Sequence, residues 1–129
     1  MDFTSDLLNK NKINYFTLDQ LYFRFIKYGT KCIELRLNDE KRQKIKTGDI
    51  IIFSEKQNNK NKIITQITNL FRYKTFQEVL DHFDIKLLAD KSISKEKLLA
   101  DLNQFYSKED QNTYGILAIE IKVLHPEEN

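Results

Sequence analysis

The sequence predicts an α+β fold in which a small mixed or antiparallel β-barrel carries three inserted amphipathic helices. Two observations support this prediction. Four or five short stretches have the alternating or β-branched apolar residues of strands, and three longer stretches repeat apolar residues at the helical period of 3.6. Because helices are inserted between short strands, a small barrel is favoured over a parallel βαβ sheet.

The clearest strand covers residues 115–124, where apolar side chains at every second position share one face. A second strand covers residues 31–37, in which Ile33, Leu35 and Leu37 alternate with Cys32, Glu34 and Arg36. Residues 50–53 and 63–71 are rich in apolar and β-branched side chains and predict two more strands, and residues 13–16 add a first one.

Each predicted helix has a start signal. Thr17 with Gln20 forms a capping box for a helix from Leu18 that stops at Gly29. A second helix follows Thr75, and a third follows Ser94. All three are amphipathic, so each is expected to pack on the strands.

The first dozen residues and the segments 55–62 and 126–129 are expected to be irregular. No internal repeat and no linker composition interrupts the chain. We therefore expect one domain over residues 1–129, with a core over residues 12–124.

Composition excludes several classes of protein. Cys32 is the sole cysteine, so no intrachain disulfide can form and a reducing, cytoplasmic location is expected. No run of 18 apolar residues predicts a membrane span, and no signal peptide is expected. The net charge is only +2, so only the placement of basic residues can indicate a polyanionic partner.

Neither a metal site nor a cofactor is expected. His82 and His125 lie far apart in the sequence, without cysteines or paired carboxylates at ligand spacing, and His82 is expected on the solvent side of its helix. The chain has three glycines and no glycine-rich phosphate loop. Ser107, with Glu109 and Asp110, is interpreted as a helix-capping turn rather than a nucleophile with its base.

One stretch resembles the signature of the ASCH domain family, which reads G-x-K-x-x-E-x-R, then a basic segment, then G-D before a strand. This stretch is GTKCIELRL at residues 29–37, followed by NDEKRQKIKTGD at residues 38–49. Three further pieces resemble the family in the right order: LFRY before a helix with TFQE, then FYSKED, then YGILAIEI. The resemblance spans residues 12–124. It implies a PUA-like barrel and association with RNA; some members are amidohydrolases acting on acetylated cytidine.

Strand alternation places Glu34 and Arg36 on one face, opposite the core-directed side chains. A guanidinium can bind phosphate or a base edge, and a carboxylate can accept from an exocyclic amine. With Lys31 at the start of the strand, the trio is expected to form the floor of a nucleotide-binding cleft. The alternative is an ordinary solvated Glu34–Arg36 ion pair, and the family resemblance favours the cleft.

Basic residues concentrate in residues 27–46, which hold seven basic and three acidic side chains, a local net charge of +4. Lys41, Arg42 and Lys44 are expected to flank the cleft and contact phosphates. The alternative is a charged turn that keeps a short helix soluble, and the sequence leaves both open.

An exposed aromatic ring near the cleft can stack on an unpaired base. Tyr73, Tyr106 and Tyr114 are candidates. Phe105 and Tyr106 lie on the apolar face of their helix and are expected in the core, which leaves Tyr114 as the best candidate.

An enzymatic role rests on Lys31 and Glu34. The family's amidohydrolases use a lysine, a threonine three residues later and a glutamate. The lysine corresponds to Lys31, but Glu34 occupies the threonine position, so the hydroxyl is missing there. A related hydrolysis remains open, in which Lys31 polarises a carbonyl and Glu34 activates water.

The leading hypothesis is an RNA- or nucleotide-binding module that uses Lys31, Glu34, Arg36, Lys41, Arg42, Lys44 and Tyr114. The alternatives are a hydrolase of a modified nucleoside, with Lys31 and Glu34 as catalytic groups, and an accessory domain that acts through a protein partner.

Overall fold

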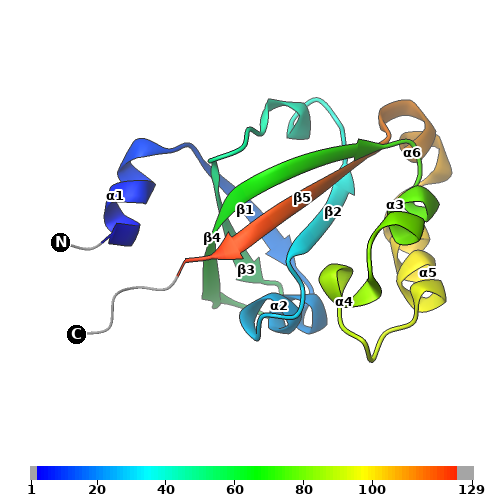
Figure 1. Ribbon diagram of the computed structural model, residues 1–129, viewed down its shortest axis with the longest axis horizontal. Coiled ribbons are helices and arrows are strands. Elements are labelled where there is room, and N and C mark those ends of the chain that lie inside the picture. The colour runs from blue at the N-terminus through cyan, green and yellow to red at the C-terminus, as the bar shows by residue number, and fades with distance from the viewer. Residues whose placement is uncertain (1–2, 125–129) are drawn as a thin grey trace.

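A five-stranded mixed sheet curls into a half-barrel in the computed structural model, which describes residues 3–124 (Figure 1). The strands are β1 (Ile13–Leu18), β2 (Ile33–Leu37), β3 (Ile50–Glu55), β4 (Asn58–Tyr73) and β5 (Ile116–Val123). Their order is β1-β3-β4-β5-β2, with β1 parallel to β3 and the other pairs antiparallel. The predicted α+β class and mixed sheet are confirmed, and β1 and β2 form the two edges of the sheet.

The helices are α1 (Phe3–Lys10), α2 (Gln20–Lys27), α3 (Phe76–His82), α4 (Ile85–Leu88), α5 (Lys95–Phe105) and α6 (Lys108–Tyr114), with a 3₁₀ turn η1 (Arg42–Lys44). The predicted starts of α3 and α5 are confirmed. The Thr75 side chain accepts from the Glu78 amide, and the Ser94 side chain accepts from the Lys97 amide. Ser107 caps α6 in the same way, accepting from the Asp110 amide.

The prediction that a helix begins at Leu18 is wrong by two residues. Thr17 and Leu18 pair with β3, so they complete β1, and Asp19 caps α2 by accepting from the Leu21 amide. The end of this helix is as predicted: Gly29 follows it with φ +86, a conformation that glycine adopts without steric cost.

Two segments expected to be irregular are regular. Residues 3–10 form α1, and residues 55–62 form the end of β3, a tight turn and the start of β4. The sequence also predicted too few helices, because α4 and α6 are too short to show a helical period. The acidic tail, residues 126–129, was expected to be irregular and lies outside the described residues.

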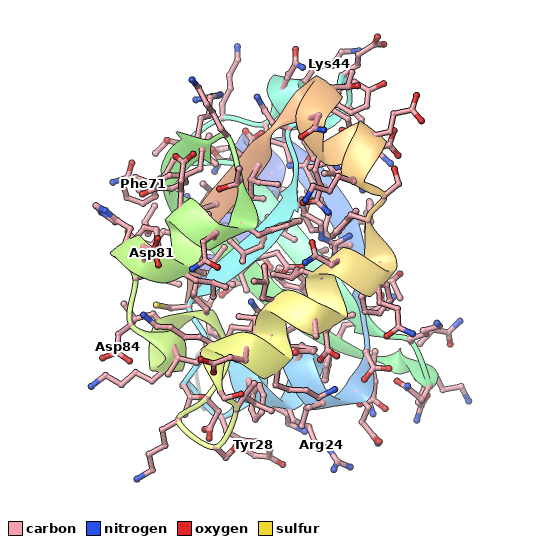
Figure 2. The ribbon with its side chains drawn as sticks, turned by 90° about the vertical axis from the view of Figure 1, so that its right-hand side faces the viewer. Arg24, Tyr28, Lys44, Phe71, Asp81 and Asp84 are labelled. Atoms are coloured by element: carbon pink, nitrogen blue, oxygen red, sulfur yellow. The ribbon has the colours of Figure 1, made fainter. Side chains whose placement is uncertain are left out.

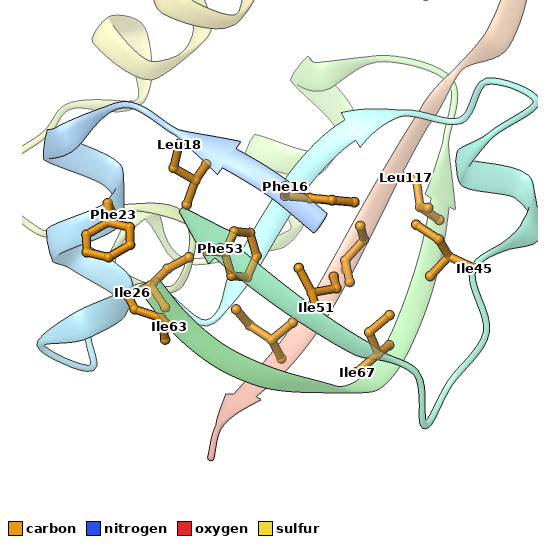
Figure 3. Packing of buried hydrophobic residues seen from close by; sticks show 12 residues of the cluster. Phe16, Leu18, Phe23, Ile26, Ile45, Ile51, Phe53, Ile63, Ile67 and Leu117 are labelled. Atoms are coloured by element: carbon orange, nitrogen blue, oxygen red, sulfur yellow. The ribbon is translucent and has the colours of Figure 1, made fainter. Parts of the chain in front are cut away.

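A first apolar core fills the concave side of the curled sheet (Figure 3). It contains Phe16, Leu18, Phe23, Ile26, Ile45, Ile51, Phe53, Ile63, Ile67, Leu117, Ile119 and Ile121. Here α2 packs against the end of the half-barrel, so the segment between β1 and β2 closes one opening of the sheet.

A second core lies on the other side of β2 and β5, under α3, α4 and α5. Ile33, Leu35 and Leu37 of β2 belong to it, as predicted for the core-directed face of that strand. Cys32 packs on it as well, rather than sharing a face with Glu34 and Arg36. Both faces of β2 are therefore covered, which sets the environment of its polar residues.

None of the helices within residues 3–124 is long and apolar enough to cross a membrane.

Candidate ligand-binding site

A pocket of about 250 Å³ lies where the two sheet edges, β1 and β2, face each other under α5. Its apolar wall comes mainly from leucines and aromatic rings, namely Leu18, Tyr22, Leu35, Leu88, Leu98, Leu102, Phe105 and Tyr106. Its polar residues are Thr17, Asp19, Lys31, Glu34, Arg36, Lys56 and Asp101. An apolar wall with a few convergent polar groups is typical of a small-ligand site.

Lys31, Glu34 and Arg36 form a buried charged cluster at this pocket. One Glu34 oxygen lies 3.2 Å from the Lys31 ammonium, and the other accepts from Arg36 Nε at 3.0 Å and Nη2 at 2.8 Å. Lys31 is 4% exposed and Glu34 is 5% exposed. The solvated ion pair considered as an alternative is therefore wrong, because the carboxylate lies inside the protein.

The position of Glu34 follows from the pairing of β2 with β5. Glu34 lies opposite Ile119 and Arg36 opposite Leu117, and these two partners belong to the first core. Directly paired residues share a face of the sheet, so Glu34 and Arg36 point into the concave side rather than to solvent. The face expected to form the floor of the cleft is thus the inner face of the half-barrel, at the edge of the sheet.

The Lys31 ammonium has no free donor. Besides Glu34, it donates to the carbonyl oxygens of Ile33 and of Leu88 in α4. An ammonium has three N–H groups, so these contacts use all of them. Burial lowers the pKa of Lys31, an effect that the nearby Glu34 opposes. Lys31 consequently ties β2 to α4 at the floor of the pocket.

Arg36 joins the two sheet edges across the pocket. Its Nη2 donates to the Thr17 carbonyl of β1 at 3.0 Å, and its guanidinium carbon lies 4.5 Å from the centre of the Phe16 ring. Burial by itself would raise the pKa of Glu34, but Arg36 and Lys31 outweigh it and hold that pKa below its usual range. Glu34 is therefore ionised at neutral pH and fixes the guanidinium in place.

The hydrogen-bonding groups left free at the pocket are mostly donors. Within residues 3–124, Arg36 Nη1 and the Lys56 ammonium have no hydrogen-bond or carboxylate partner. The carboxylates are in use: Asp19 accepts from the Leu21 amide and Gln57, while Glu34 accepts from Arg36.

A third pocket carboxylate, Asp101, accepts from Tyr22 at 3.1 Å and Lys97 at 2.8 Å. The Tyr106 hydroxyl has no hydrogen-bond partner in the described part of the chain, and burial raises the pKa of this phenol, so it is neutral. A ligand would thus meet two cationic donors and one neutral hydroxyl.

The comparisons with known proteins agree with this architecture. A family model described as "ASCH domain" matches residues 16–125. The chain belongs to the ASCH domain family. Lys31, Glu34 and Arg36, which belong to the G-x-K-x-x-E-x-R motif, form the buried charged cluster of this ASCH domain.

Two solved structures resemble this ASCH domain over nearly their whole length. The crystal structure of the hypothetical protein PH0355 matches with a TM-score of 0.76 and 35% identity, covering 88% of this chain and 99% of that chain. The solution NMR structure of the protein PF0455 from Pyrococcus furiosus matches with a TM-score of 0.70 and 30% identity, covering 88% and 98%. No curated protein matches the chain.

The pocket of this ASCH domain contains aromatic rings other than the expected one. Phe105 was expected in the core but is 70% exposed at the pocket, because it is the last residue of α5. Tyr106 stacks on Phe76 with ring centres 5.7 Å apart and is only partly buried. Tyr114 is exposed on α6 and is not among the residues that line the pocket.

The basic segment of this ASCH domain lies beside the pocket rather than in it. Lys41 and Lys44 are exposed, and Arg42 pairs with Asp39 at 3.1 Å. The guanidinium carbon of Arg42 lies 5.7 Å from the Phe16 ring that Arg36 also contacts. Phe16 therefore connects the pocket to the basic segment, a contact between distant residues that no sequence pattern indicates.

Metal ligands do not gather in the described part of this ASCH domain: no group of three or more histidine, cysteine, aspartate or glutamate residues could hold an ion. His82 is on the solvent side of α3, as predicted, with its ring 5.8 Å from that of Tyr73. His125 lies outside the described residues.

Proposed function

We propose that this ASCH domain binds single-stranded RNA, or a nucleotide, with one nucleotide unit in the pocket between β1 and β2. Membership of a family generally associated with RNA supports this proposal. The observation that carries it is the pattern of free groups: the carboxylates at the pocket are bonded, whereas Arg36 Nη1 and Lys56 are not. Unpaired cationic donors match a phosphate or the acceptor edge of a base.

A single compact pocket suits one unit of a single strand better than it suits a duplex. At about 250 Å³ it falls just below the usual range for small-molecule sites, roughly 300–1,000 Å³. A duplex would need a long shallow surface, whereas a splayed base of a single strand needs one hollow and a ring to stack on. The exposed ring of Phe105 and the half-buried ring of Tyr106 supply stacking surfaces.

Binding rather than hydrolysis is the proposal because of the state of Lys31 and Glu34. The Lys31 ammonium uses all its donors within the protein, and both Glu34 oxygens already accept hydrogen bonds. A general base must reach the proton that it abstracts, and an electrophile must reach the carbonyl. In our proposal these two residues instead shape the floor and orient Arg36.

The test is binding of short single-stranded RNAs and of mononucleotides at low salt, measured by titration calorimetry. Lys56→Ala removes one cationic donor and should weaken RNA binding about tenfold, the loss expected for one charge-assisted hydrogen bond. Phe105→Ala removes the exposed ring and should weaken it by about 1–3 kcal/mol per stacked base.

Two exposed residues outside the pocket provide matched controls. Lys122→Ala removes a cation from β5, and Tyr15→Ala removes an aromatic ring from β1 that is as exposed as Phe105. Both should leave affinity unchanged. Equal losses in the pocket variants and the controls would contradict the proposed site. Turnover of acetylated cytidine by the wild-type protein would replace binding with hydrolysis as the function.

A further inference from the structure

A second hollow lies beside the first, between α2 and the β3–β4 hairpin. It has a volume of about 390 Å³ and is lined by Gln20, Phe23, Arg24, Lys27, Tyr28, Glu55, Gln57, Asn58 and Asn61. Figure 2 shows Arg24 and Tyr28 at the lower end of the molecule, with Lys44 of the basic segment at the upper end. Unlike the first pocket, this hollow is lined almost entirely by polar and charged side chains.

Glu55 distinguishes this hollow from an ordinary surface depression. Its side chain is only 6% exposed, yet no hydrogen bond or ion pair satisfies its carboxylate within residues 3–124. Glu55 is the last residue of β3, two positions after the core residue Phe53, so its side chain points to the inner side of the sheet. Among the described residues the fully buried side-chain atoms without a partner are Asn38 Oδ1 and Arg42 Nε, so the Glu55 oxygens open onto the hollow, where a donor from a ligand can bind them.

The groups around Glu55 complement a nucleotide. Arg24 and Lys27 have no carboxylate partner in the described residues, so both are available to a phosphate. Tyr28 is 72% exposed and offers a ring for stacking. The side-chain amides of Gln20 and Asn61 can donate to and accept from a base edge.

The second hollow adjoins the first pocket along the chain. Asp19 and Lys56 line the first pocket, and their chain neighbours Gln20, Glu55 and Gln57 line the second. A hydrogen bond links a lining residue of each: Gln57 Nε2 donates to Asp19 Oδ1 at 2.8 Å. Successive nucleotides of one strand can therefore occupy neighbouring hollows.

We infer that the hollow around Glu55 is a second nucleotide subsite, in which the carboxylate accepts from the amino group of a base. This inference rests on the proposed function, because it assigns the neighbouring unit of the same single strand. Guanine fits best, since its ring N–H and amino group present two adjacent donors to the two carboxylate oxygens. Cytosine and adenine present one amino group, and uracil presents none.

The experiment uses the full chain and dinucleotides that pair uridine with each of the four nucleosides, in both orders, together with the mononucleotides. Glu55→Gln keeps the shape of the side chain but replaces an acceptor oxygen with a donor. It should weaken binding of the guanosine dinucleotides at least about tenfold, as expected for a lost bidentate pair, and leave the uridine dinucleotide unchanged. Glu109→Gln, an exposed carboxylate on α6, is the matched control.

Tyr28→Ala gives a second readout that does not depend on a buried residue. It should reduce the affinity advantage of a dinucleotide over a mononucleotide while leaving mononucleotide affinity intact. Thermal unfolding shows whether Glu55→Gln folds. If it does not, Tyr28→Ala decides whether the second subsite exists.

The outcomes separate the two proposals. If Lys56→Ala weakens binding but Glu55→Gln and Tyr28→Ala do not, the second subsite is wrong and the proposed function stands. An equal loss for all dinucleotides with Glu55→Gln also overturns recognition of an amino group. If the wild-type protein binds no oligonucleotide or mononucleotide at low salt, both proposals fail.

Discussion

At the scale of the residue, Glu34 is shared between two cations. Its Oε1 lies 3.2 Å from Lys31 Nζ, and its Oε2 accepts from two nitrogens of Arg36. Taking three charges out of water is unfavourable, and mutual attraction offsets this cost only when the geometry is good and the remaining donors are bonded. The carbonyls of Ile33, Leu88 and Thr17 supply all of these bonds except that of Arg36 Nη1, which faces the pocket without a partner within residues 3–124. Removing one member of the cluster therefore leaves an uncompensated buried charge.

Acidification should destabilise the protein through Glu34. Its pKa in the folded protein lies below the usual value of 4.5, so its contribution to stability is present above pH 4.5 and is lost as the pH falls through the folded pKa. Glu34→Gln removes this titration and should lower the free energy of unfolding at neutral pH by about 3–5 kcal/mol. Urea denaturation of both proteins between pH 7 and about pH 3 measures the two effects.

The variant should consequently lose less stability than the wild-type protein over the same acid range. Glu96→Gln, an exposed change at the start of α5, should follow the wild-type curve. Parallel curves for Glu34→Gln and the wild-type protein would show that Glu34 does not carry the pH dependence.

At the scale of the element, the corner between α6 and β5 depends on Gly115. This residue ends α6 with φ +70, and a Cβ built on it would lie 2.9 Å from the Tyr73 carbonyl oxygen. The close approach matters because Tyr73 pairs with Ile116 at the end of the β4–β5 ladder, and the Gly115 carbonyl accepts from the Asn38 amide. The corner thus connects β4, β5 and the end of β2.

Gly115→Ala should lower the free energy of unfolding by more than Gly48→Ala. Both positions have positive φ, which costs about 1–3 kcal/mol for a residue with a side chain. Only Gly115 adds a clash with backbone, since nothing lies within 4 Å of a Cβ at Gly48. Chemical denaturation of the two variants compares them directly; equal losses would mean that the corner relaxes around the added methyl group.

At the scale of the whole molecule, the three candidate contact regions follow one another. The hollow around Glu55 adjoins the first pocket through the Asp19–Gln57 hydrogen bond, and the first pocket adjoins the basic segment through the Phe16 ring, which Arg36 and Arg42 both contact. Our proposals therefore place a single strand along this series, with bases in the two hollows and the backbone near the basic segment.

The lysines of the basic segment should control the salt dependence of RNA binding rather than its specificity. Lys41 and Lys44 are exposed and have no carboxylate partner within residues 3–124. Replacing both with alanine should weaken binding similarly for all sequences. It should also reduce the slope of log affinity against log salt by about 0.7 for each lost phosphate contact to a single strand.

Fluorescence titrations at several salt concentrations measure this slope. A double replacement of Lys86 and Lys122 removes the same charge from α4 and β5 and should leave the slope unchanged. If the two double variants behave alike, the basic segment is a solvated turn, the alternative that the sequence left open.

The sequence by itself determined most of the local structure. Alternation placed β2 and β5, and apolar and β-branched runs indicated β3 and most of β4. Thr75 and Ser94 marked the starts of their helices, because capping depends on residues only a few positions apart. The family motif by itself also indicates Lys31, Glu34 and Arg36 as site residues. The local signals failed where pairing with a distant strand overrides them, as at Thr17 and Leu18, and where a helix is too short to show a period, as in α4 and α6.

Only the tertiary structure decided what the polar residues face. Glu34 is buried because β2 pairs with β5, and Lys31 and Arg36 are bonded to carbonyls of Leu88 and Thr17, which are distant in the sequence. Phe105 is exposed and Glu55 is buried, the reverse of what their chemistry predicts. Burial depends on which elements meet in space, and a local pattern reports the face on which a side chain lies but not what covers that face.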